Sequence, residues 1–468
     1  MDQRLRALNR FGLGARPGER DRIGDPRGWL RDQLRGGAPA LSPPAGASAN
    51  EIADALRSLR MVAQGDTAAR QQARQRIARI IAAEQPAALT RRATSDLPYV
   101  ERLVSFWSNH LCVSAGAKLL VAPLAGSYER DVIRPHVLGR FEDMVLASAR
   151  HPAMLIYLDN FQSIGPESRG AQQGRRAGGA AGARRGLNEN YARELLELHT
   201  LGVDGGYAQQ DVIELARILT GWTVSGLAAP GAAAPRGLRA RAREAATGPL
   251  RFGFQELLHE PGNKALLGER YGESGEAEGE RAIRSLCRHP STARFLATKL
   301  ATHFIADSPP PSAIERLSRS FRESEGDLRV LADTLIDIPE AWSEDTRKFR
   351  TPQEWLVAVL RAFQAPEANE ALAASLRQLR HPLWAPASPK GYGDSTQEWA
   401  DPDSLLNRAE LARTIARRVG ARAMDPRALL EVVDVAPTDP LTVLLSDNSI
   451  AAPERIALAI AGPAFQWR

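Results

Sequence analysis

Apolar residues recur along this chain with the spacing of helices, and hardly any stretch alternates with the two-residue period of a strand. Within residues 67–92, for example, Ile77, Ile80 and Ile81 point inward while a Gln/Arg-rich face is solvated. The predicted helices cover residues 51–61, 67–92, 97–111, 129–150, 152–159, 279–287, 291–306, 312–324, 327–336, 352–363, 369–379, 405–419, 428–433, 440–445 and 452–460. The chain is therefore predicted to be all-α, with one large multi-helix domain over residues 1–468.

Three segments interrupt this pattern. Residues 161–187 and 226–251 are rich in Gly, Ala and Arg and cannot bury a core, so both are expected to be flexible basic insertions. Residues 382–402 form an aromatic, Pro-rich loop that carries Trp384, Tyr392 and Trp399. Aromatic side chains on a rigid loop suit a stacking platform for a ligand, and they suit a lid over the core equally well.

Two further helices are predicted between residues 187 and 222, joined by a Gly-rich turn. The first has an apolar stripe made of Tyr191, Leu195 and Leu198. Its polar stripe has the same spacing and consists of Asn190, Glu194 and Glu197. His199 falls about half a turn from Glu194 if the helix stays regular. Gly202 is expected to end the helix, and Ala208 cannot cap the next one with a side-chain oxygen.

The composition indicates which classes of protein this chain could belong to. Of the 468 residues 43% are hydrophobic and 25% are charged, and no apolar run approaches the ~20 residues that cross a bilayer. The formal net charge is +6, but each basic insertion alone carries five Arg against one Glu. The rest of the chain is therefore nearly neutral, and no nucleic-acid partner is predicted. No export signal is visible at the start, so a cytoplasmic location is expected, or a periplasmic one if the true start lies upstream.

Long segments of the chain resemble one bacterial family, domain of unknown function 1800. They include LNENYARELLELHTLGVDGGY from Leu187, FWSNH from Phe106, KLATHFIAD from Lys299 and PLWAPASPKGY from Pro382. The resemblance covers essentially the whole chain, although the family has no established activity. It also implies a candidate partner, because relatives are often encoded beside a protein similar to the sulfatase and phosphatase superfamily, domain of unknown function 1501.

Histidines and carboxylates supply the candidate chemistry. The predicted metal ligands are His110, His136, His199 and His303, and the predicted catalytic residues are Glu194, Glu197 and His199. The metal would be a transition metal such as Fe or Zn, serving hydrolysis or oxidation, although no HExxH motif is present. Two alternatives stay open. The glutamates could belong to a buried ionic network, and the protein could be a non-catalytic helical scaffold or maturation partner.

Overall fold

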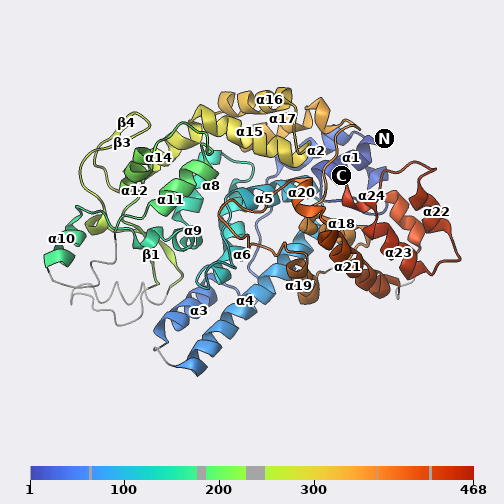
Figure 1. Cartoon of the computed structure of the whole chain (residues 1–468), viewed down its shortest axis with the longest axis horizontal. Helices are drawn as coiled ribbons and strands as arrows, with labels where there is room; N and C mark the ends of the chain where they lie inside the picture. The colour runs from blue at the N-terminus through green and yellow to red at the C-terminus, as the bar shows by residue number, and fades with distance from the viewer. Residues whose placement is uncertain (1, 63–65, 177–185, 228–247, 366, 421–423) are drawn as a thin grey trace.

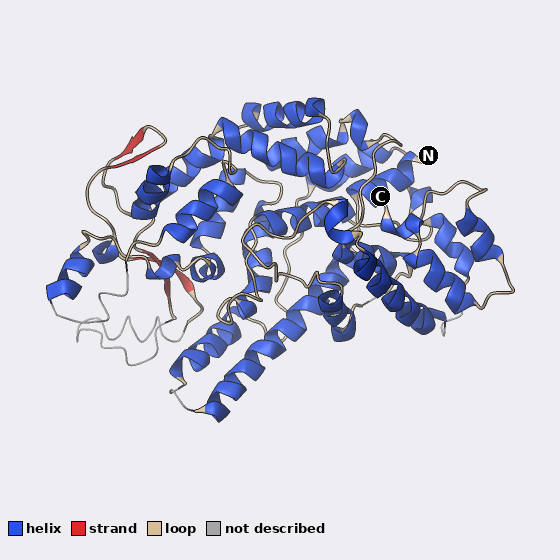
Figure 2. Cartoon of the chain, in the orientation of Figure 1, coloured by secondary structure: helices blue, strands red, loops and turns tan. Residues whose placement is uncertain are grey.

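The computed structural model describes residues 2–62, 66–176, 186–227, 248–365, 367–420 and 424–468, and these residues are predominantly helical, as Figure 2 shows. The first helices are α1 (Gln3–Arg6), α2 (Pro26–Arg35), α3 (Ala49–Met61), α4 (Thr67–Thr94), α5 (Pro98–His110), α6 (Ala125–Tyr128), α7 (Arg134–His136), α8 (Phe141–Arg150) and α9 (Pro152–Tyr157). The middle ones are α10 (Arg169–Arg176), α11 (Glu189–Glu194), α12 (Gln209–Ile218), α14 (Glu276–Arg288), α15 (Pro290–Phe304), α16 (Pro311–Glu323) and α17 (Leu328–Ile336). The last are α18 (Pro352–Ala362), α19 (Glu370–Gln378), α20 (Thr396–Trp399), α21 (Pro402–Gly420), α22 (Pro440–Ser446), α23 (Ala452–Ala461) and α24 (Pro463–Gln466). The predicted all-α class is confirmed.

Four short strands in the described part of the chain depart from the prediction. Strand β1 (Trp222–Ser225) pairs antiparallel with β2 (Arg251–Phe254), and β3 (Lys264–Leu266) pairs antiparallel with β4 (Glu269–Tyr271). Runs of three or four residues are too short to establish a two-residue period, so the sequence pattern could not reveal them. The predicted insertion at 161–187 includes α10, and residues 177–185 of it lie outside the described part of the chain, as do 228–247 of the second insertion.

The helix predicted over residues 129–150 is wrong as a single element. A π-helical turn at Glu129–Ile133 leads into α7, and the chain then leaves the helix before α8 begins at Phe141. The backbone around Gly139 bonds to a distant segment instead, since Leu328 N donates to Gly139 O at 2.8 Å and Phe141 N donates to Gly326 O at 2.8 Å. These two bonds replace hydrogen bonds that a continuous helix would need.

Two hydrophobic clusters organise the described residues. The larger one joins the helices from α2 to α17, and the smaller one is built on α18, α19, α21 and α23. Figure 1 shows α22 to α24 at one end of the molecule, α8 to α14 at the other, and the hairpin of α3 and α4 projecting from the middle. Trp384 packs against both clusters. The aromatic loop 382–402 therefore lies where the two cores meet.

No helix in the described part of the chain is both long enough and apolar enough to cross a membrane.

Candidate functional site

A cavity of about 510 Å³ opens where α5, α15, the start of α18 and the loop 382–402 converge. Its lining from these segments includes Arg102, Phe106, His110, Phe295, Lys299, His303, Gln353, Glu354, Trp384, Tyr392 and Asp394. Three further lining residues come from the π-helix Leu195–His199 and the turn after it: Glu197, Leu198 and Val203. A volume of this size suits a small organic molecule.

Helix α15 places its side chains on the cavity wall through helical spacing. Pro290 lies in its first turn and the His289 side chain caps it, accepting a hydrogen bond from Ser291 N at 3.2 Å. Phe295, Lys299 and His303 recur every four residues and therefore share one face. Lys299 and His303 therefore lie one helical turn apart on the cavity wall.

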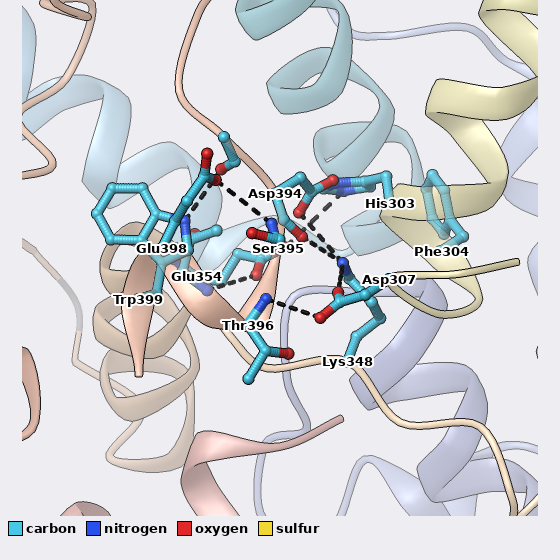
Figure 3. Close-up of polar contacts among 12 residues, drawn as sticks. His303, Phe304, Asp307, Lys348, Glu354, Asp394, Ser395, Thr396, Glu398 and Trp399 are labelled. Atoms are coloured by element: carbon cyan, nitrogen blue, oxygen red, sulfur yellow. Dashed lines mark hydrogen bonds and ion pairs between the residues drawn. The ribbon is translucent and has the colours of Figure 1, made fainter. Parts of the chain in front are cut away.

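His303 is held by a carboxylate from the loop. Its Nδ1 lies 2.6 Å from Asp394 Oδ2, a contact visible in Figure 3. Burial lowers the pKa of His303 below its usual value even though Asp394 opposes this shift. Burial alone would raise the pKa of Asp394, but the attraction of His303 and Lys348 outweighs it and the pKa falls. A neutral imidazole therefore donates its Nδ1–H to an ionised carboxylate.

The other side of His303 faces a buried ionic network. Glu354 forms ion pairs with Arg102 and with Arg468, the latter through Oε1 and Nη2 at 3.0 Å. Burial opposes ionisation of Glu354, yet these two guanidinium groups hold its pKa well below the usual range. Arg102 Nη1 lies 3.4 Å from His303 Nε2, which is long for a hydrogen bond.

The loop that carries Asp394 is fixed at several points. Lys348 pairs with Asp307 at 2.6 Å and also donates to the carbonyl oxygen of Asp394, while Thr396 N donates to Asp307 Oδ2 at 2.8 Å (Figure 3). Asn109 on α5 donates to Tyr392 O and accepts from Tyr392 N, both at 2.8 Å. The position of Asp394 is therefore set by contacts on both sides of it.

Aromatic side chains of the loop divide between the two roles considered from the sequence. Trp384 and Tyr392 line the cavity, and Trp384 Nε1 donates to Glu129 Oε2 at 2.9 Å. Trp399 is buried and stacks on the His381 ring with centroids 4.6 Å apart. The rings of Trp384 and Tyr392 are therefore available to a ligand, whereas the ring of Trp399 packs against His381.

A second basic group lies beside His110. Lys299 Nζ donates to His110 Nδ1 at 3.1 Å, and His110 Nε2 donates to the carbonyl oxygen of His199 at 3.1 Å. Burial lowers the pKa of Lys299 to about 8 and, together with the Lys299 charge, takes the pKa of His110 well below its usual value. A neutral histidine therefore accepts a hydrogen bond from an amine that titrates close to neutral pH.

Cys112 also lines the cavity, but its chemistry is suppressed. Its Sγ lies 3.2 Å from the carbonyl oxygen of Pro389. Burial raises the pKa of this thiol to about 12. The reactive thiolate is therefore scarce at neutral pH, and Cys112 is not a candidate nucleophile.

The structure gathers three of the residues predicted from the sequence, because His110, His303 and Glu197 all line the cavity. His199 lies behind His110 and is buried, and burial lowers its pKa to about 3. Glu194 is half-buried and does not belong to the lining, and burial together with Glu197 raises its pKa.

His136 has a different environment from the other predicted ligands. Its Nδ1 lies 2.7 Å from Val132 O on the preceding turn, and it does not line the cavity. Across the described ranges, no group of three or more His, Cys, Asp or Glu side chains is arranged so that it could hold a metal ion. The metal centre and its ligand set therefore stay a prediction from the sequence.

Four residues at the cavity were missed from the sequence: Arg102, Lys299, Glu354 and Asp394. Lys299 and His303 lie four residues apart in the segment KLATHFIAD, a spacing that could have indicated a shared helix face. Asp394 follows the loop segment PLWAPASPKGY, but no local pattern places it beside a histidine 91 residues earlier.

Comparisons with known proteins agree with the resemblance seen in the sequence. No curated protein and no solved structure matches the chain. The family described as "Protein of unknown function (DUF1800)" matches residues 6–467, nearly the full length. The chain therefore belongs to the DUF1800 family.

Proposed function

We propose that the protein is an enzyme that uses His303, oriented by Asp394, as a general acid–base in the cavity. The observation that carries this proposal is the 2.6 Å contact between His303 Nδ1 and Asp394 Oδ2 on the cavity wall. A carboxylate that accepts the Nδ1–H holds an imidazole in one tautomer and stabilises the imidazolium formed when Nε2 takes a proton. Nε2 is then the basic nitrogen of the pair.

The protonation state suits this role. The lowered pKa of His303 keeps the ring neutral at pH 7, so Nε2 carries a lone pair, which faces Arg102 Nη1 at 3.4 Å. The pKa of Asp394 is lowered, so the ring faces an anion throughout the neutral range. A general base needs this combination of a neutral ring and a fixed counter-charge.

The surroundings supply a binding site for the reacting molecule. Apolar side chains such as Phe106, Phe295 and Trp384 line the cavity together with charged ones such as Arg102, Lys299 and Glu354. Apolar walls that also carry polar groups are typical of small-molecule sites. A buried ionic network with only a structural role is the competing explanation for the His303–Asp394 pair, and the experiments below separate the two.

The first test needs no substrate. Nuclear magnetic resonance of protein labelled with ¹⁵N in histidine is expected to show His303 as the neutral Nδ1–H tautomer at pH 7, and Asp394→Asn is expected to disturb that state. An imidazolium, or the Nε2–H tautomer, in the wild-type protein would contradict the proposal.

The second test is a screen of esters, lactones, amides, phosphomonoesters and sulfate esters. Turnover of any of them is expected to fall about 10²- to 10⁴-fold in His303→Gln, the usual contribution of a positioned acid–base. His136→Gln is the matched control, because His136 lies outside the cavity lining and bonds within its own helix. Turnover that survives in a folded His303→Gln variant would show that the pair is structural.

A further inference from the structure

The cavity contains a cation for which the described residues provide no counter-ion. Lys299 is half-buried, and no carboxylate among the described residues forms an ion pair with its ammonium group. Its contacts are His110 Nδ1 at 3.1 Å and the Phe295 ring, whose centroid lies 5.5 Å from Nζ. A charge removed from water in this way costs free energy unless a partner compensates it.

His110 does not supply the compensation. Its Nε2–H donates to the carbonyl oxygen of His199, so the Nδ1 that meets Lys299 is the lone-pair nitrogen of a neutral ring. This contact uses one of the three N–H groups of the lysine. Two donors and the whole positive charge are left for another partner.

The carboxylates that line the cavity already have partners. Glu354 pairs with Arg102 and Arg468, Asp394 pairs with His303, and Glu197 lies 3.6 Å from Arg193. Glu398 accepts from the backbone of Ser395 and caps its short helix. Among the residues that the structure describes, none therefore supplies a counter-ion to Lys299, and its charge is available to a bound group.

The cavity that contains Lys299 also has apolar walls. Phe106, Phe295, Leu198, Val203 and Trp384 contribute to the walls of the same cavity. Val203 is 68% exposed, which places an apolar side chain at the open side. A ligand that fits both features has an apolar body and one anionic group.

We propose that Lys299 binds the carboxylate of a small organic acid with an apolar body, and that this acid is the substrate class of the site. The inference rests on the proposed function, because it assigns the substrate of the same cavity. Lys299 and His303 stand one turn apart on α15, so an acid anchored on Lys299 presents its neighbouring atoms to His303.

The charge of the ligand gives this proposal a distinctive signature. A carboxylate can accept the two N–H groups of Lys299 that the contact with His110 leaves unused. A ligand of similar shape without a charge lacks this interaction, and added salt weakens the binding of the charged ligand only.

The experiment is calorimetric titration of the full-length protein with benzoate, benzyl alcohol and phenyl phosphate at pH 7 and at two salt concentrations. Benzoate is expected to bind about tenfold more tightly than benzyl alcohol at low salt, as expected for a charged partner. Equal affinity of the two, or absence of benzoate binding up to about 10 mM, would overturn the proposal.

Two lysine variants provide the matched comparison. Lys299→Met is expected to weaken benzoate binding about tenfold, whereas Lys390→Met, an exposed lysine at the same cavity, is expected to change it less than about threefold. An unchanged affinity in Lys299→Met contradicts the assignment. The wild-type comparison of benzoate with benzyl alcohol decides the question if this variant does not fold. If phenyl phosphate binds more tightly than benzoate, the preferred anionic group is a phosphoryl group, and the proposed substrate class of carboxylic acids is wrong.

His303→Gln separates this inference from the proposed function. Benzoate is expected to bind this variant within about threefold of the wild type, because His303 does not contact the lysine charge. Normal binding of benzoate together with an unaffected turnover in His303→Gln would leave the anion site standing while the acid–base role fails.

Discussion

Replacing Glu354 by Gln removes the anion that two buried guanidinium groups share. Arg102 is 1% exposed and Arg468 is 7% exposed, and both pair with Glu354 Oε1. Breaking a buried pair by removing one partner costs about 3–5 kcal/mol, because the remaining charge stays buried without compensation. We therefore expect the free energy of unfolding of Glu354→Gln to fall by about 3 kcal/mol or more at pH 7.

The pH dependence follows from the direction of the pKa shift. The pKa of Glu354 in the folded protein lies well below 4.5, the value it has when unperturbed. Its contribution to stability is therefore complete above pH 4.5 and is lost as the pH falls through the lower, folded value. The difference between the wild type and Glu354→Gln should thus stay constant from pH 7 to about pH 5 and shrink below about pH 4.

The assay is urea unfolding followed by tryptophan fluorescence at a series of pH values. Glu323→Gln is the control, since Glu323 is exposed on α16. Surface substitutions of this kind change the free energy of unfolding by about 0.5 kcal/mol or less. A loss below about 1 kcal/mol in Glu354→Gln, or a loss that does not vary between pH 7 and pH 3, would refute the account of the network given above.

Three other predictions concern the buried thiols, a glycine of the loop 382–402 and the metal centre predicted from the sequence. Cys112 and Cys287 are both buried free thiols with raised pKa values, so iodoacetamide is expected to label neither in the native protein at pH 8 and both after unfolding; native labelling would contradict this. Gly391 has φ +84° and an added Cβ would lie 2.5 Å from Asn109 O, so Gly391→Ala should lower stability by more than about 1 kcal/mol and more than Gly268→Ala, where φ is +81° but the space is open. Elemental analysis tests the metal centre predicted from the sequence: stoichiometric Fe or Zn that disappears when the four histidines predicted as ligands are changed to Ala would support it, and its retention in those variants would refute those ligands.

Much of the helical architecture could be predicted because periodicity is a local property of the sequence. The helix predicted over 97–111 is α5 (Pro98–His110), and the one over 327–336 is α17 (Leu328–Ile336). The helix ends at His199 with Thr200 as its C-cap, so Gly202, with φ +84°, lies in the turn beyond the helix and not at its end as predicted. Ala208 indeed gives no side-chain cap, and Asp211 Oδ2 compensates by accepting from Ala208 N at 2.8 Å. Predictions from neighbouring residues therefore succeed where the stabilising contacts also join neighbouring residues.

The candidate site was harder to predict because its geometry depends on contacts between distant segments. A π-helical stretch at Leu195–His199 widens the helix on which Glu194, Glu197 and His199 were placed, so the regular spacing assumed for them does not apply. Of these three residues only Glu197 lines the cavity. Lys299 and His303 share a helix face that the sequence contained, but only the tertiary fold shows that this face meets the loop 382–402.

The two members of the proposed acid–base pair belong to elements of different character. His303 lies on a long helix packed into the larger core, while Asp394 lies on a loop anchored by Asn109, Lys348 and Asp307. A local opening of that loop would separate the pair while the helices stay folded. Catalytic competence could then be gained and lost on the timescale of loop motion, and substitutions in the anchors could tune the active fraction of molecules without any change in the reacting groups.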